Sequence, residues 1–319
     1  MSTVLAPRLV GARLPAQRRP ARGLAPAGPR RRLPPSRLRA TWNTLKTAVL
    51  LATLAGVLML VGSLFGELGA LLGLVAGLAL VGGSYWFSDR LALRAAGAVP
   101  VQSWEMPDYH RIVRELCRDA DLPMPRLYVT PDAQPNAFAT GRSPRHAAVA
   151  VTRGLLEVLS PGELRAVLAH ELAHVRNRDI LVTSVAAAVA TGITFLANLA
   201  GWLPLFGSAD DEDAPSPLGL LLAALLAPVA AALLQLALSR SREYEADRTG
   251  AVLAGDSRAL ARALTRIEAA ARRRPMSVEP AQAGKYLVNP LTGRHVTLAG
   301  LFSTHPPVEA RIARLAQLA

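Results

Sequence analysis

The sequence has a single cysteine, Cys117, among 319 residues. No internal disulfide can form, so the cysteine content gives no sign of an oxidising compartment. Lysine is almost as scarce: Lys46 and Lys285 are the only two, so the basic charge comes almost entirely from arginine. The first 40 residues contain ten arginines and no Asp or Glu. Without any apolar periodicity, residues 1–40 are expected to form a disordered Arg/Pro-rich tail.

The basic tail has more than one possible role. Arg-rich, acid-free segments are typical of organellar transit peptides. A tail that lies on the membrane, or an extension from an upstream start codon, explains the same composition, and we prefer these simpler interpretations. The formal net charge of +13 could also indicate nucleic-acid binding. No nucleic-acid-binding motif follows the tail, so we expect no nucleic-acid partner.

Hydrophobic residues make up 51% of the chain, and they are separated from the charges along the sequence. Four uncharged runs are each close to the 20 or so residues with which a helix crosses a bilayer. Buried helices of a large soluble core are the alternative, but four such runs favour an integral membrane protein. The sequence therefore predicts four transmembrane helices in two hairpins (41–87 and 180–239), at 47–65, 68–87, about 180–206 and 216–239. Glycines that suit close helix packing recur in the first hairpin, at Gly62, Gly66, Gly69, Gly73 and Gly77.

The charges beside these runs predict their orientation. The turn inside the first hairpin contains only Glu67, and the turn inside the second contains the acidic residues 210–213. Arginines flank the other ends of the runs, at Arg90, Arg94, Arg176, Arg178, Arg240 and Arg242. Positive charge stays in the cytoplasm. Residues 1–40, 88–179 and 240–319 should therefore all face the cytoplasm.

The cytoplasmic segments show local signals for a mainly α structure with a small β-sheet. Residues 107–120 have a helical apolar face, while 126–130 and 147–152 read as short strands. Ser160 and Glu163 form a capping box around Pro161. A helix should therefore begin at this point.

That helix carries the motif His-Glu-x-x-His, formed by His170, Glu171 and His174. Residues four apart lie on one helical face, so the two imidazoles can reach one metal ion. Glu171 lies beside that face and can hold a water molecule. A charged patch on an amphipathic helix is the simpler alternative. The position of the motif on a well-capped helix favours the metal site.

A catalytic zinc needs a third protein ligand, and the best candidates follow the last hydrophobic run. Glu243 and Asp247 are four residues apart, so their carboxylates should share a helical face. One can bind the metal while the other accepts a hydrogen bond from a ligand histidine. A solvated helix with Arg–Glu pairs explains the spacing equally well. His110, His146 and His295 lack any ligand-like spacing.

Together these residues resemble the HtpX family of membrane zinc proteases. The two histidines are followed, after a predicted hairpin, by Ser-Arg-x-x-Glu-x-x-Ala-Asp at 239–247. The stretch Asn-Ala-Phe-Ala-Thr-Gly at 136–141, Val-Asn-Pro-Leu at 288–291 and Phe-Ser-Thr-His-Pro-Pro at 302–307 also match in order. The resemblance runs from Trp42 to Leu318. The tail is longer than expected for the family.

The resemblance implies a zincin-like metalloprotease domain facing the cytoplasm and one Zn²⁺ per chain. His170, His174 and Glu243 would be the metal ligands, Glu171 the general base, and Asp247 the partner of a ligand histidine. His305 and Arg311 would stabilise the oxyanion. Alternatively, His305 caps the final helix and Arg311 is one more surface charge. No ligand role is predicted for Glu245 or Asp179, although Asp179 could cap the motif helix.

The function implied is quality control at the plasma or inner membrane during stress. The enzyme would hydrolyse unfolded or damaged membrane proteins, with a homo-oligomer as a possible assembly. An extended peptide would lie along 147–152, and Asn136 and Phe138 would be near the strand that binds it. Two rivals are a scaffold that has lost its chemistry and a prenyl-protein processing enzyme. The scaffold is disfavoured because the base and the three proposed metal ligands are all present. The prenyl-protein processing enzyme is disfavoured because four spans are few for it.

Overall fold

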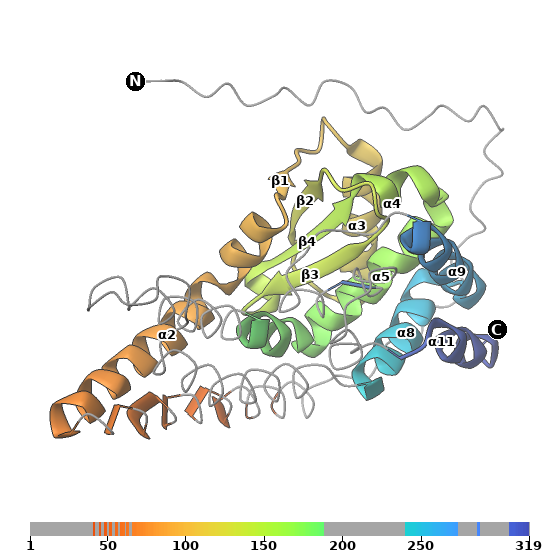
Figure 1. Ribbon diagram of the computed structural model, residues 1–319. Helices are drawn as coiled ribbons and strands as arrows, with labels where there is room; N and C mark the ends of the chain where they lie inside the picture. Colours follow the sequence, from red (N-terminus) through yellow and green to blue (C-terminus); the bar gives the residue numbers. More distant parts are fainter. Residues whose placement is uncertain are drawn as a thin grey trace, which may run out of the picture. The chain divides into compact units, whose positions relative to one another are not determined.

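The computed structural model describes residues 66–187, 240–273, 286–287 and 306–318, with shorter stretches between 41 and 63. This part of the chain is mostly helical and contains one mixed sheet (Figure 1). Several predictions lie outside the described residues: the tail 1–40, most of the second hairpin, His295 and His305. The four-span topology and the domain boundaries therefore stay predictions.

Helix α2 (Gly66–Ala95) begins in the predicted first hairpin and ends at the sheet (Figure 1). Two of its glycines lie where the preceding segment comes closest. A Cβ added at Gly73 would collide with the backbone of Leu58, and one at Gly77 would lie 2.9 Å from the Cα of Ala55. The close packing expected from the glycine pattern is found at these positions.

Within the described residues, no single helix has both the length and the hydrophobicity needed to cross a bilayer. The segments Gly66–Leu80 and Tyr85–Ala95 of α2 meet that requirement only as a pair, with a 62° bend between them. The apolar run predicted at 68–87 is thus part of a longer helix, which continues to Ala95.

The sheet contains β1 (Val99–Pro100), β2 (Arg126–Thr130), β3 (Ala137–Gly141) and β4 (Ala147–Thr152), in the order β1-β2-β4-β3. β2 and β4 are parallel, and the other two pairs are antiparallel. The strands predicted at 126–130 and 147–152 are confirmed with the same bounds. The prediction that substrate lies along 147–152 is wrong, because β4 is an interior strand paired on both sides. β3, which carries Phe138, is an edge strand, and β1 lies at the opposite edge.

The described fold also contains the helices α3 (Pro107–Ala120), α4 (Arg153–Val158), α5 (Pro161–Asn177), α8 (Arg240–Ala254), α9 (Ser257–Arg273) and α11 (Val308–Ala316). A short 3-10 helix, η1 (Pro144–His146), precedes β4, and residues 179–187 after α5 are also helical. The helix predicted at 107–120 is confirmed. So is the capping box: the Ser160 N–H donates to Glu163 Oε2 at 2.9 Å, and the Glu163 N–H donates to Ser160 Oγ at 3.4 Å.

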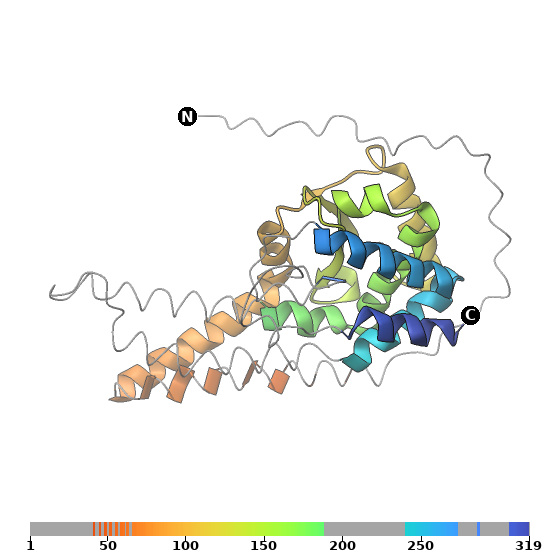
Figure 2. The same cartoon turned by 45° about the vertical axis from the view of Figure 1, so that its right-hand side comes forward.

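The two faces of the sheet bury different side chains, because successive strand residues point to opposite sides. Val149 and Val151 join the main core with α3 and α5. Ala148, Ala150 and Phe138 pack on the other face with Leu93 at the end of α2. Beyond α5, helices α8, α9 and α11 contact one another in turn, and Figure 2 shows α9 and α11 beside α8. In the described part of the protein, α5 thus lies between the sheet and these helices.

Candidate metal centre

The predicted motif lies on α5, where both histidines point to the same side. Their rings are 4.8 Å apart between centroids and almost perpendicular, at 87°. The two Nε2 atoms are 3.2 Å from each other. His170 is 1% exposed, and the side chain of His174 is 15% exposed. The i, i+4 spacing thus brings a ring nitrogen from each histidine to one point.

Helix α8 brings a carboxylate to the same point. Oε1 of Glu243 lies 3.5 Å from His174 Nε2, and Oε2 lies 3.8 Å from His170 Nε2. One ligand atom from each of His170, His174 and Glu243 can be chosen so that all three lie within 4.8 Å of one another. Of the two acids that the spacing left open, Glu243 is therefore the one whose carboxylate lies beside both Nε2 atoms.

Asp247 lies behind His170, one turn further along α8. Its Oδ1 is 3.0 Å from His170 Nδ1, on the side of the ring that faces away from Glu243. Asp179 stands in the same relation to His174, with 3.0 Å between Oδ2 and Nδ1. This role of Asp179 was not among the sequence-based predictions. Helix α5 ends at the left-handed residue Arg178 (φ 59°), and this reversal brings the next side chain back to the ring.

These contacts create a site that needs a cation. Because a carboxylate only accepts hydrogen bonds, Asp179 favours the proton on Nδ1 of His174, and the negative charge of Asp247 next to His170 Nδ1 favours the same tautomer there. The Nε2 lone pairs then face each other and the Glu243 carboxylate. Burial lowers the pKa of His174, but Glu243 and Asp179 outweigh it and raise the pKa to about 9. A proton can serve as the cation, and so can a metal ion held by two imidazoles and a carboxylate, a donor set that zinc accepts.

Glu171 is suited to proton transfer. It is 3% exposed, and burial raises its pKa to about 7, with a further rise from the nearby charge of Glu243. Interaction with the backbone of Ala139 in β3 acts in the opposite direction. A carboxyl group whose pKa lies near neutrality can both take and return a proton at cellular pH.

Arg311 of α11 is fully buried, so the interpretation of it as a surface charge is wrong. Its Nε and Nη2 donate to the two oxygens of Asp247 at 2.8 and 2.6 Å, and Nη1 donates to the Leu287 carbonyl at 3.0 Å. Burial alone would raise the pKa of Asp247, but Arg311 outweighs it and lowers the pKa to about 2. These contacts make Arg311 the residue that orients Asp247. Its oxyanion role stays a prediction.

The other predicted residues lie away from the three ligand atoms. The Asn136 side chain accepts a hydrogen bond from the Ala137 N–H at 3.1 Å and so helps to shape the start of β3. The Phe138 side chain packs on the face of the sheet opposite to the main core. His110 contacts the Val101 carbonyl at 2.9 Å, and His146 contacts Ser143 at 3.0 Å, so both serve local structure.

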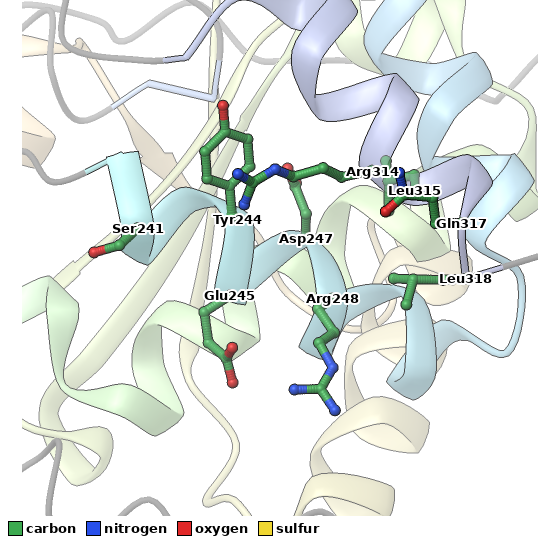
Figure 3. Close-up of a pocket in the computed structure, with 9 residues that line it drawn as sticks. All are labelled: Ser241, Tyr244, Glu245, Asp247, Arg248, Arg314, Leu315, Gln317 and Leu318. Carbon is green, nitrogen blue, oxygen red and sulfur yellow. The ribbon is translucent and has the colours of Figure 1, made fainter.

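A separate cavity of about 710 Å³ lies between α8 and α11 (Figure 3). Tyr244 and Arg248 line it from α8, and Arg314 enters from α11 with its guanidinium carbon 3.6 Å from the centroid of the Tyr244 ring. Neither of the two histidines nor Glu243 lines this cavity. Its lining shares only Asp247 with the metal centre.

Comparison with known proteins shows that the chain is similar to a family of peptidases. The model of peptidase family M48 matches residues 103–319. "Protease HtpX homolog" of Pelotomaculum thermopropionicum is 50% identical over 281 residues, which cover 87% of this chain and 99% of the relative. The protein of the same description from Syntrophobacter fumaroxidans is 50% identical over 276 residues, covering 85% and 97%. The crystal structure of S. mikatae Ste24p is 19% identical with a TM-score of 0.48, covering 88% of this chain and 66% of that one.

Proposed function

The chain belongs to the HtpX proteases of peptidase family M48, and we propose that it is a membrane-bound zinc endopeptidase with its active site on the cytoplasmic side. One observation carries the metal assignment. The Nε2 atoms of His170 and His174 face each other at 3.2 Å beside Glu243, while each Nδ1 lies 3.0 Å from a buried aspartate. That arrangement has the donors of a catalytic zinc site with three protein ligands.

In the proposed reaction, His170, His174 and Glu243 hold the metal. When bound, zinc would polarise the scissile carbonyl and make a water molecule more acidic. Glu171 takes the proton of the attacking water and later delivers it to the leaving amine, for which a pKa near 7 is suited. Asp247 and Asp179 keep the two imidazoles oriented, an effect typically worth 10- to 100-fold in metal affinity.

The edge of β3 is the proposed binding place for the peptide. Ala139 lies in this strand and interacts through its backbone with Glu171, so a peptide added here would pass the base. Pairing between backbones is largely independent of side-chain identity. This supports unfolded or damaged membrane proteins as substrates and quality control as the role. The hydrophobic runs and the arginines beside them support the membrane location.

The test uses the full chain purified in detergent. Metal content by mass spectrometry should approach one zinc per chain, and casein should be cleaved. A chelator should remove both zinc and activity, and added zinc should restore them together. Retention of full activity by metal-free protein would contradict the proposal, as would zinc-loaded protein that cuts no unfolded substrate.

A further inference from the structure

Residues 86–93, where α2 reaches the sheet, have one buried face and one exposed face. Four of these residues are buried, and Leu93 packs on the sheet. The exposed face carries large apolar side chains: Trp86 is 56% exposed, Phe87 50% and Leu91 46%. A contiguous apolar surface of this kind marks a place where a partner covers the protein.

An arginine lies over each of the two exposed rings. The guanidinium carbon of Arg90 is 5.7 Å from the centroid of the Phe87 ring. That of Arg142 is 4.6 Å from the centroid of the Trp86 ring. Arg142 is in the turn between β3 and β4, so the second arginine comes from the sheet and not from α2. A guanidinium stacked on a ring keeps the N–H donors at its edge available for a second partner.

Within the described residues, neither of these two guanidiniums has a carboxylate partner. The nearest acid along the chain, Asp89, is occupied by Arg126, whose Nη2 lies 2.6 Å from Asp89 Oδ2. Arg94 and Arg145 are also exposed and make no ion pair in the described part of the chain. The uncompensated positive charge at this face favours an anionic partner.

The residues before this point identify the kind of anion. There α2 exposes more than half of four apolar side chains, those of Leu71, Leu72, Val75 and Leu78. Apolar, aromatic and basic side chains thus follow one another along the helix. The same order occurs across a bilayer, from the hydrocarbon through the interface, where Trp is enriched, to the phosphates that Arg reaches. A free phosphate ion would match the arginines, but it would leave the apolar side chains in contact with water.

We propose that an anionic phospholipid binds at this lipid collar, which consists of Trp86, Phe87, Arg90, Leu91 and Arg142. The acyl chains of the lipid cover the apolar side chains, and its phosphate accepts hydrogen bonds from the two arginines. This inference rests on the proposed membrane location of the chain. It adds a specific ligand class and the residues that recognise it.

The collar also has a consequence for the proposed reaction. Arg142 follows Ala139 by three residues, which span about 10 Å of extended chain. The backbone of Ala139 interacts with Glu171. A lipid bound to Arg142 therefore keeps the proposed base close to the bilayer surface, where segments that emerge from the membrane are within reach.

Trp86 reports directly on the lipid beside it. The other three tryptophans are replaced (Trp42→Phe, Trp104→Phe and Trp202→Phe), and the full chain is reconstituted into vesicles of phosphatidylcholine and phosphatidylglycerol. Bromine on the acyl chains of one lipid at a time quenches Trp86, and the two quenching curves yield the relative affinity of the two lipids at this ring. We expect phosphatidylglycerol to bind at least about fivefold more tightly, since one arginine beside an anionic lipid contributes about that factor. High salt should weaken the preference.

Arg90→Gln combined with Arg142→Gln should bring the two affinities close to equality, because a neutral amide does not favour the anionic headgroup. Arg114→Gln is the matched control. Arg114 is exposed and makes no ion pair in the described residues, but it lies in α3, which packs against the other face of the sheet. The control should keep the wild-type preference. A preference that survives in the double variant would overturn the role of the two arginines.

Other results would contradict the collar itself. Equal quenching by the two lipids without the arginine substitutions would show that the site is not anionic in preference. No quenching by either lipid would show that protein, such as a second copy of the chain, covers Trp86. If the tryptophan variant does not fold, native mass spectrometry of the wild type decides, because it should retain phosphatidylglycerol in preference to phosphatidylcholine. Casein cleavage by the same vesicles tests the protease function separately, since lipid quenching needs neither zinc nor activity.

Discussion

Gly250 of α8 lies directly against His170 of α5. A Cβ placed at Gly250 would be 2.8 Å from both the Cα and the N of His170, closer than real Cβ atoms come to such neighbours. The helices cross at the residue that provides a predicted ligand. This close crossing allows Glu243 and Asp247, on the same helix as Gly250, to reach both sides of the His170 ring.

Gly250→Ala should therefore push α8 away from α5. We expect a loss of about 1–3 kcal/mol in stability, as for other overpacked cores, together with weaker zinc binding. Thermal unfolding and zinc titration measure the two effects. Gly162→Ala is the control: Gly162 lies in α5, but a Cβ there meets nothing within 4 Å. Similar losses in both variants would show that the crossing has no special role.

Glu171→Gln should remove proteolysis and leave zinc bound. The amide keeps the shape of the side chain but cannot take a proton, so we expect a loss of about 10²- to 10⁴-fold in the cleavage rate. Metal analysis and casein cleavage on the same preparation measure both properties. Near wild-type cleavage by the variant would show that the base is another residue.

Asp179→Asn should weaken zinc binding by about 10- to 100-fold, because the carboxylate that orients His174 is lost. Competition with a fluorescent zinc chelator measures the change. Asp256→Asn is a suitable control, since Asp256 is an exposed acid in the turn before α9. An unchanged zinc affinity for Asp179→Asn would mean that this contact does not support the metal centre.

Arg311→Leu should destabilise the protein by about 3–5 kcal/mol, since it leaves the Asp247 carboxylate buried without its partner. Adding Asp247→Asn to that variant should recover part of the loss, because the buried charge is removed as well. Chemical unfolding of the wild type, the two single variants and the double variant measures the coupling. Additive losses would indicate that the two side chains are energetically independent despite their short contacts.

Cys117 offers a test that depends on pH. The thiol is 4% exposed, and burial raises its pKa to about 11. At pH 8 its thiolate fraction should be about 100-fold lower than in the unfolded chain, so iodoacetamide should label it only after denaturation. Because the folded pKa is the higher one, this group stabilises the fold below pH 9 and loses that contribution as the pH rises towards 11. Rapid labelling of native protein, detected by intact mass, would contradict the buried position.

The sequence predicted the elements whose signals are local. The capping box at Ser160 and the strands at 126–130 and 147–152 are set by residues within one or two turns of chain, and the structure has them at the predicted places. The prediction that His170 and His174 lie together likewise depended only on the geometry of a single helix. For the same reason, the four-residue spacing of Glu243 and Asp247 predicted that they share a helical face, although it did not predict their partners.

The tertiary structure decided which groups meet across long separations. Spacing could not choose between Glu243 and Asp247, because the choice depends on how α8 crosses α5 at Gly250. Arg311 and Asp247 are 64 residues apart in the sequence. No local sequence pattern around either residue predicts the other as its partner. The edge position of β3 depends on a sheet order in which β4 lies between β2 and β3. Composition and periodicity determine which segments become helices and strands, but long-range packing determines which of their side chains share one buried site.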